Sequence, residues 1–171
     1  VTSVLVKAVS EALKDHPRVG ASFENGMLRP MRRINVGIAV GLDTGELVVP
    51  VLRNAGSLTL EEIGVQAKDL ISRARKKRLL PDELQGGVIT ISNLGMFGIE
   101  SFVPIINPGE SAIIGIGAIM DQPVATEGGV QIQKRMKVSA SFDHRVVNGV
   151  LGALFLDRFR ELLEDCERLA E

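Results

Sequence analysis

Apolar residues recur at helical spacing in three stretches of the chain, which are residues 2–15, 59–79 and 149–170. Pro17 follows the first stretch as a stop, and Thr2 is the residue expected to cap its start. Thr59 and Glu62 form a capping box at the start of the second stretch. The third stretch follows an Asn-Gly break at 148–149. The pattern therefore predicts three helices.

Shorter apolar or alternating runs predict strands at residues 19–24, 27–32, 35–42, 46–52, 87–92, 112–119 and 130–142, the last of them one long strand or a pair. Turn residues at 24–26 and 43–45 predict two hairpins. Side chains alternate over residues 137–143, which indicates a half-buried strand that ends at Asp143. This order of helices and strands predicts a two-layer α/β sandwich with a mixed sheet.

Composition places the chain among single globular domains, since 171 residues with 45% hydrophobic and 24% charged residues can bury a sizeable core. A net charge of −1 gives no reason to expect nucleic-acid binding. One cysteine and the absence of Asn-x-Ser/Thr fit an intracellular compartment. No apolar run approaches the ~20 residues that a membrane span needs. The chain begins at Val1, so we expect it to be part of a longer polypeptide.

His144 is the strongest candidate for chemistry, because it lies on the short connection between a predicted strand and the last predicted helix. An imidazole there can take and return a proton near neutral pH. A structural hydrogen-bonding role is the alternative for a lone histidine at a strand end. The other histidine, His16, lies in an Asp-His-Pro sequence at the end of the first helix, where a surface or capping role is expected.

The run from His144 to Gly149 resembles the His-x-x-x-Asp-Gly signature of the dihydrolipoamide acyltransferases, the E2 core subunits of 2-oxo acid dehydrogenase complexes, and more distantly that of the chloramphenicol acetyltransferases. Further resemblance follows in the family's order in Gly37-Ile38-Ala39-Val40, Leu47-Val48-Val49-Pro50-Val51, Thr90-Ile91-Ser92-Asn93-Leu94-Gly95-Met96-Phe97-Gly98, Asn107-Pro108-Gly109-Glu110 and Ala112-Ile113-Ile114-Gly115-Ile116-Gly117. The chain is identified as the E2 catalytic domain over residues 1–171. The resemblance implies a chloramphenicol acetyltransferase-like fold, without the N-terminal part of that domain and without the lipoyl and peripheral-subunit-binding domains.

The resemblance implies transfer of an acyl group, acetyl favoured, from S-acyl-dihydrolipoyl-lysine to coenzyme A. Coenzyme A is then a substrate, the lipoyl group comes on a lipoyl domain outside this chain, and no metal is needed. His144 would be the general base on the thiol, and Ser92 would stabilise the oxyanion. Thr90 and Asn93 are nearby alternatives to Ser92, whose hydroxyl could otherwise bond the backbone at a strand end. No residues that bind the cofactor can be assigned.

Asn148 departs from the usual family pattern, which has aspartate. Its amide can cap the last helix or orient the His144 loop by hydrogen bonds, and the two roles are compatible. Asp143 and Arg145 are expected to serve loop geometry and ion pairing. Cys166 falls on the apolar stripe of the last predicted helix, which indicates a core residue and not a nucleophile.

A basic run at Arg73, Arg75 and residues 76–78 ends the second predicted helix. Its position favours interaction with the helix dipole over binding of cofactor phosphates or of an acidic partner domain.

The resemblance also implies a homotrimer whose active sites lie at subunit interfaces, with the histidine and the serine supplied by different subunits. Such trimers assemble into a cubic or dodecahedral core that works with the lipoyl domain and with the E1 and E3 components. The compartment would be a bacterial or archaeal cytoplasm or a mitochondrial matrix, and no nucleic-acid or membrane partner is expected. Two alternatives are a non-catalytic E2-like scaffold and a coenzyme A-dependent O-acetyltransferase.

Overall fold

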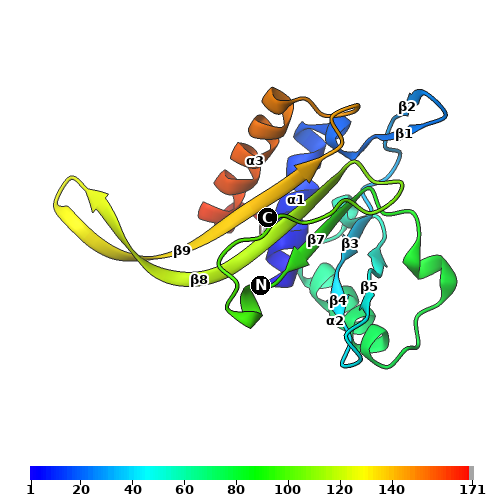
Figure 1. Ribbon diagram of the computed structural model, residues 1–171, viewed down its shortest axis with the longest axis horizontal. Coiled ribbons are helices and arrows are strands. Elements are labelled where there is room, and N and C mark those ends of the chain that lie inside the picture. The colour runs from blue at the N-terminus through cyan, green and yellow to red at the C-terminus, as the bar shows by residue number, and fades with distance from the viewer. Residues whose placement is uncertain (170–171) are drawn as a thin grey trace.

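Three helices cover one face of the central sheet in the computed structural model, which describes residues 1–169 (Figure 1). Helix α1 (Thr2–Asp15) lies between α2 (Leu60–Arg75) and α3 (Gly149–Glu164) and contacts both. Its apolar stripe is buried from Leu5 to Leu13, as the helical spacing predicts, and Val4 is partly buried. The predicted Thr2 cap is wrong, because the helix starts at Thr2 and its N-cap position, Val1, makes no side-chain cap bond. His16 is the C-cap residue.

The capping box of α2 is confirmed: the Glu62 amide donates to Thr59 Oγ1 at 3.2 Å, and the Thr59 amide donates to Glu62 Oε2 at 2.8 Å. The predicted end of this helix near Leu79 is wrong. Helix α2 ends at Arg75, and Lys77 then takes a left-handed backbone conformation with φ of 52°. This turn brings the short helix η3 (Pro81–Leu84) back against α2.

Helix α3 also ends earlier than predicted, at Glu164, and the chain continues as a 3₁₀ helix over Cys166–Leu169. Ala170, the predicted end, lies outside the described residues. The predicted core position of Cys166 is wrong, because the change in helix type breaks the α-helical period on which that prediction rested. Cys166 is exposed and its Sγ lies 3.0 Å from the Leu163 carbonyl oxygen, whereas Leu169 is buried.

The central sheet is mixed and has five strands in the order β6-β3-β7-β8-β9. These strands are β3 (Val36–Ile38), β6 (Val51–Leu52), β7 (Ile89–Asn93), β8 (Ala112–Thr126) and β9 (Gly129–Phe142). Strands β3, β7 and β8 run parallel, while β6 and β9 pair antiparallel at the two edges. The predicted mixed sheet with helices against it is confirmed.

The two predicted hairpins are present but shorter than expected. Strands β1 (Ser22–Glu24) and β2 (Met27–Arg29) join through Asn25 and Gly26, both with positive φ, and the chain before β1 is a 3₁₀ helix, η1 (Pro17–Gly20). The second hairpin is interrupted. Its outer part, β4 (Val40–Gly41) with β5 (Leu47–Val48), forms a separate small sheet, while β3 and β6 pair within the central one.

Strands β8 and β9 continue past the body of the molecule as a two-stranded ribbon (Figure 1). An irregularity between Ile116 and Ile119 separates the part of β8 in the body from the ribbon. The predicted end of β8 at Ile119 is wrong by seven residues, since the strand runs to Thr126. Polar and charged residues in the ribbon hid its strand pattern. Among residues 1–169, no helix is long and apolar enough to cross a membrane.

The sheet has two chemically different faces. The helix-covered face is apolar and includes Ile91 and Ile114, and Phe142 meets Phe155 of α3 edge-on at 6.3 Å. On the opposite face, cross-strand pairing aligns Ser92 with Gly115 and Ser139, and Thr90 with Ile113 and Ser141. We call the face that carries the hydroxyl groups of Thr90, Ser92, Ser139 and Ser141 the hydroxyl face. Residues 99–110, the cover loop, lie over it.

Candidate active site

His144 is exposed on a tight turn that directly follows β9. The Asp143 amide donates to the Ser111 carbonyl at 2.8 Å, and the amides of Val146 and Val147 both donate to the Asp143 carbonyl at 2.9 Å. The side chains of Val146 and Val147 are 1% exposed and fix the far end of the turn in the core. Neither ring nitrogen of His144 has a hydrogen-bond partner in the part of the chain described. The backbone that carries His144 is therefore fixed by hydrogen bonds, while both ring nitrogens are accessible to a ligand.

Arg145 braces this turn, as expected. Its guanidinium group pairs with Asp143 at 2.6 Å and lies 4.7 Å from the ring centroid of Phe23 on β1. The hydrogen bond from Arg145 lowers the pKa of the Asp143 carboxyl. Arg18 adds a second brace, because its Nε donates to the Val146 carbonyl at 3.0 Å. Sequence reasoning did not identify Phe23 or Arg18, since only the fold brings them to this turn.

Asn148 is the N-cap of α3: its Oδ1 accepts from the Leu151 amide at 2.9 Å. The predicted capping role is confirmed. No hydrogen bond joins Asn148 to His144 within residues 1–169. The cap fixes where the turn ends and the helix begins.

Ser92 is the one hydroxyl group of the hydroxyl face that has no hydrogen-bond partner among the described residues. Ser139 Oγ donates to the Phe102 carbonyl, and Ser141 Oγ donates to the Pro104 carbonyl at 2.6 Å. Thr90 is fully buried and bonded to Glu110. The Ser92 hydroxyl is half-buried and free to donate to a ligand, which differs from the alternative of a strand-end bond to the backbone.

Of the two alternatives to Ser92, Thr90 does not fit an oxyanion donor, and Asn93 has its side-chain oxygen engaged. The Thr90 hydroxyl is enclosed and bonded, and Asn93 Oδ1 accepts from the Gly95 amide at 2.9 Å to hold the following turn. Among residues 1–169, the Ser92 hydroxyl and the Asn93 side-chain NH₂ both keep a partly accessible donor without a partner, whereas the Thr90 hydroxyl does not.

Ser92 and His144 lie far apart within one chain. Ser92 pairs with Gly115 on β8, and Gly115 pairs with Ser139 on β9. His144 then follows Ser139 by five residues toward the opposite end of the sheet. Two strand spacings and the length of these residues give a separation of about 20 Å. One chain therefore does not bring the predicted base and the predicted oxyanion donor to a common point.

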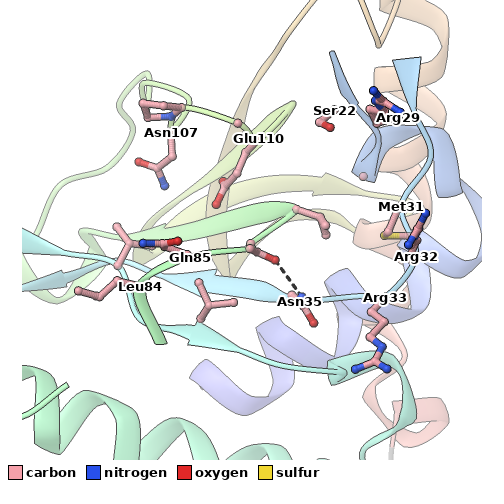
Figure 2. Close-up of a pocket in the computed structure, with 18 of the residues that line it drawn as sticks. Ser22, Arg29, Met31, Arg32, Arg33, Asn35, Leu84, Gln85, Asn107 and Glu110 are labelled. Carbon is pink, nitrogen blue, oxygen red and sulfur yellow. Dashed lines mark hydrogen bonds between the residues drawn. The ribbon is translucent and has the colours of Figure 1, made fainter. Parts of the chain in front are cut away.

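Glu110 is a partly buried residue at the end of the cover loop, which sequence reasoning quoted within a motif but did not single out. Burial raises the pKa of its carboxyl group to about 7, while hydrogen bonds with Thr90 and Asn107 offset part of the rise. Figure 2 shows Glu110 and Asn107 pointing into a pocket of about 960 Å³, opposite Arg29 and Arg32. The feature of the sequence that could have identified Glu110 is the position of a glutamate between a Pro-Gly turn and an apolar strand.

Two cations of the basic run at the end of α2 make ion pairs within the fold. Arg73 pairs with Asp69 at 2.7 Å and with Glu83 at 2.6 Å, and Lys77 pairs with Glu46 at 3.0 Å. Arg73 and Arg75 lie in the last turn of the helix, where cations offset its dipole. The position-based interpretation of this run agrees with these contacts.

Comparison with known proteins agrees with the acyltransferase resemblance found in the sequence. The sequence model of the 2-oxoacid dehydrogenases acyltransferase (catalytic domain) matches residues 1–171. The dihydrolipoyllysine-residue acetyltransferase component of the pyruvate dehydrogenase complex of Rickettsia bellii is 38% identical and is matched over 96% of this chain and 39% of its own length. The dihydrolipoyllysine-residue succinyltransferase component of the 2-oxoglutarate dehydrogenase complex of Haemophilus influenzae is 42% identical, over 98% and 41%. The chain thus spans about two fifths of the length of these curated relatives.

Solved structures agree. Azotobacter vinelandii dihydrolipoamide acetyltransferase superposes with a TM-score of 0.93 at 36% identity and covers 100% of this chain, which spans 71% of that one. A chloramphenicol acetyltransferase reaches a TM-score of 0.60 at 13% identity, over 95% of this chain and 77% of that one, which supports the fold alone. The predicted fold is confirmed. On its sequence model and its relatives, the chain belongs to the 2-oxoacid dehydrogenase acyltransferase family, in its catalytic domain.

Proposed function

We propose that residues 1–171 are an acyltransferase catalytic domain that moves an acyl group, acetyl favoured, from S-acyl-dihydrolipoyl-lysine to coenzyme A. The observation that carries this proposal is the unused Ser92 hydroxyl on a face whose other three hydroxyl groups are all bonded. A free donor on a rigid strand suits the stabilisation of an oxyanion. The exposed imidazole of His144 on its braced turn supplies the matching base.

In this proposal, His144 takes the proton from the thiol of coenzyme A, and the thiolate attacks the carbonyl carbon of the acyl-dihydrolipoyl thioester. Ser92 donates a hydrogen bond to the oxyanion of the tetrahedral intermediate. The carbon–sulfur bond to the dihydrolipoyl group then breaks, and that sulfur takes the proton back from His144. One thioester replaces another, so the residues of this chain need to supply only a base, an oxyanion donor and orientation.

The relative from Azotobacter vinelandii supports these roles. Its structure was studied for the role of a serine, a histidine and an asparagine in the catalytic mechanism, and the last two are four positions apart in that enzyme. His144 and Asn148 have the same spacing here. We propose that Asn148 keeps the His144 turn in place by capping α3.

We further propose that the working unit is a homotrimer in which His144 of one subunit meets Ser92 of the next. The separation of the two residues within one chain supports a site that a second copy completes. The loop after β7 and the cover loop expose large apolar side chains that a neighbouring subunit would bury; these are Met96, Phe97, Val103 and Ile105, between 69% and 88% exposed.

Assembly and partners are proposed from the relatives. A solved structure at a TM-score of 0.93 is the cubic core of a pyruvate dehydrogenase multienzyme complex. By analogy, trimers of this chain would build a cubic or dodecahedral core that receives acyl groups from a lipoyl domain and works with E1 and E3 components. The relatives come from bacteria and from a fission yeast mitochondrion, so we propose a cytoplasmic or matrix location.

The direct test is coenzyme A-dependent deacylation of acetyl-dihydrolipoamide, with succinyl-dihydrolipoamide measured in parallel to compare the acyl groups. We expect His144→Ala to lower kcat by about 10²–10⁴-fold and Ser92→Ala by about 10²–10³-fold. His16→Ala is the matched control and should leave kcat unchanged. A trimeric, folded sample without turnover of either thioester would contradict the proposal and favour a scaffold, while transfer to a hydroxyl acceptor in preference to coenzyme A would favour an O-acetyltransferase.

A further inference from the structure

The carboxyl group of Glu110 holds one hydroxyl group of β7 from the cover loop. Thr90 Oγ1 lies 2.9 Å and 2.8 Å from the two carboxyl oxygens of Glu110, and Asn107 Nδ2 donates to the same Oγ1 at 2.8 Å. Asn107 and Glu110 are the ends of one turn, closed by a bond from the Glu110 amide to the Asn107 carbonyl at 3.1 Å. The side chains at both ends of the turn therefore form hydrogen bonds with the single hydroxyl group of Thr90.

Two glycines provide the space that the side chains of Thr90, Asn107 and Glu110 occupy. A Cβ at Gly37, the cross-strand neighbour of Thr90 on β3, would lie 2.4 Å from Thr90 Oγ1. A Cβ at Gly87 would lie 2.6 Å from Glu110 Oε1. The Thr90 hydroxyl is thus packed against the bare backbone of Gly37, and the Glu110 carboxyl against that of Gly87. Their positions are fixed by close packing as well as by hydrogen bonds.

A carboxyl group in this position is costly to the fold. Its shifted pKa results from burial, and within the described part of the chain the side-chain contacts that oppose the shift are those with uncharged Thr90 and Asn107. The charged groups that line the same pocket are Glu24, Arg29, Arg32 and Arg33. An apolar residue would fill the space without this desolvation cost. A buried group with a strongly shifted pKa next to a candidate site is a sign of function.

We propose that Glu110 is a positioning residue for acyl transfer, which holds β7 through Thr90 so that Ser92 is presented to the reacting thioester. Ser92 follows Thr90 by two residues and shares its face of the strand. The inference rests on the proposed function of Ser92 and deepens it. It gives the cover loop a role in the site, since Glu110 transmits the position of the loop to the strand that carries the oxyanion donor.

The protonation state of Glu110 sets how firmly Thr90 is held. The neutral carboxyl group both donates and accepts and suits its uncharged surroundings. The hydrogen bonds with Thr90 and Asn107 favour the ionised carboxylate, but burial disfavours it more, so the carboxylate gains by turning toward solvent and toward the arginines on the opposite wall of the pocket (Figure 2). Thr90 then keeps only its bond with Asn107 and β7 loosens, so kcat falls as the pH rises above neutral.

The first experiment compares Glu110→Gln and Glu110→Ala by the kcat and KM for coenzyme A between pH 6 and pH 9. Glutamine keeps the hydrogen bonds of the neutral carboxyl group, so we expect wild-type kcat at neutral pH but no fall at alkaline pH. Alanine removes one of the two partners of the Thr90 hydroxyl, and we expect a loss of about 10- to 100-fold in kcat with little change in KM. Glu127→Gln, at the tip of the ribbon, is the matched control. Wild-type kcat and pH profile in a folded Glu110→Ala variant would overturn the inference.

A second measurement does not depend on turnover. Amide hydrogen exchange at Ile91, Ser92 and Asn93, referenced to the core amides of α1, reports the rigidity of β7. We expect Glu110→Ala to speed this exchange by about tenfold and Glu110→Gln to leave it unchanged. Equal exchange in all three proteins would overturn the positioning role. Loss of turnover in His144→Ala tests the proposed function separately, so failure of one proposal is distinguishable from failure of the other.

Discussion

Ser92 and His144 are related through the sheet by two strand pairings and lie toward its opposite ends. Ser92 is aligned with Gly115 and through it with Ser139, and His144 lies beyond the C-terminal end of the same strand, β9. A separation of about 20 Å is several times the reach of a hydrogen bond or a proton transfer. If both residues act on one thioester, they act from different subunits.

Mixed trimers of His144→Ala and Ser92→Ala should therefore regain activity that neither variant has alone. Random mixing of equal amounts, after joint unfolding and refolding, leaves about one site in four with both residues intact, because each site takes one residue from each of two subunits. The measurement is kcat per site for acetyl transfer to coenzyme A. We expect about a quarter of the wild-type value.

The control for this complementation is His144→Ala mixed with the double variant Ser92→Ala/His144→Ala. No subunit in that mixture carries His144, so activity should stay at the level of the single variants. Trimers of the two single variants that form in the expected proportions and remain inactive would show that the two residues do not share a site.

Local sequence patterns predicted the elements whose causes are local. The capping box of Thr59 and Glu62 and the cap at Asn148 both depend on residues three positions apart, and both are present. The helix ends failed where distant contacts decide them. Arg73 bonds Glu83 across the turn after α2, and the helix stops short of the predicted end. Periodicity alone cannot register such a contact.

The residues of the candidate site also differ in whether local sequence or distant contacts reveal them. His144 could be found from its place between a strand and a helix. The sequence could not show that Ser92 is the hydroxyl group left without a partner on its face of the sheet. That contrast depends on Ser139 and Ser141, which bond carbonyl groups of the cover loop 37 positions away. Glu110 escaped for the same reason: its burial and its bond to Thr90 exist only once β7, β8 and the cover loop are assembled.

Asn148→Ala should remove the cap of α3 and lower the free energy of unfolding by about 1 kcal/mol. Asn148→Asp keeps an acceptor and adds a negative charge at the helix N-terminus, so it should keep most of that stability. Denaturant unfolding measures both. Thr59→Ala is the matched control, since it removes a cap from α2, far from the His144 turn.

The two caps differ in their expected effect on catalysis. We expect Asn148→Ala to lower kcat as well as stability, and Thr59→Ala to lower stability alone. Equal kcat for both variants, at equal fractions folded, would show that Asn148 acts only as a cap and does not orient the His144 turn.

Glu83→Gln should reduce stability at neutral pH but not in strong acid. The hydrogen bonds from Arg73 and from the Leu80 amide lower the pKa of the Glu83 carboxyl to about 2. A carboxyl group whose pKa is lower in the folded state stabilises the fold above its unfolded pKa, and this contribution is lost as the pH falls toward about 2. Because the pair is near the surface, we expect a difference of about 1 kcal/mol between wild type and variant at pH 7.

Urea unfolding at a series of pH values measures that difference. It should shrink steadily below pH 4 and disappear near the folded pKa. A constant difference across this range would mean that the glutamine disturbs η3 by some route other than the ion pair with Arg73.

Glu110→Gln should have the opposite pH dependence. The pKa of Glu110 is raised to about 7, above its value of about 4.3 in an unfolded chain, so the native state holds a proton that the unfolded state has released. Between these two pH values the unfolded state binds fewer protons, and stability therefore falls as the pH rises, by up to about 3 kcal/mol in total. The glutamine variant does not titrate here and should lose this slope, becoming more stable than wild type at pH 8 although it gains no contact.

The measurement is the free energy of unfolding from pH 4 to pH 9, with Glu127→Gln expected to follow wild type throughout. Parallel curves for wild type and Glu110→Gln would show that the carboxyl group is ionised in the folded state at neutral pH, and would remove the reason for a fall in kcat above it.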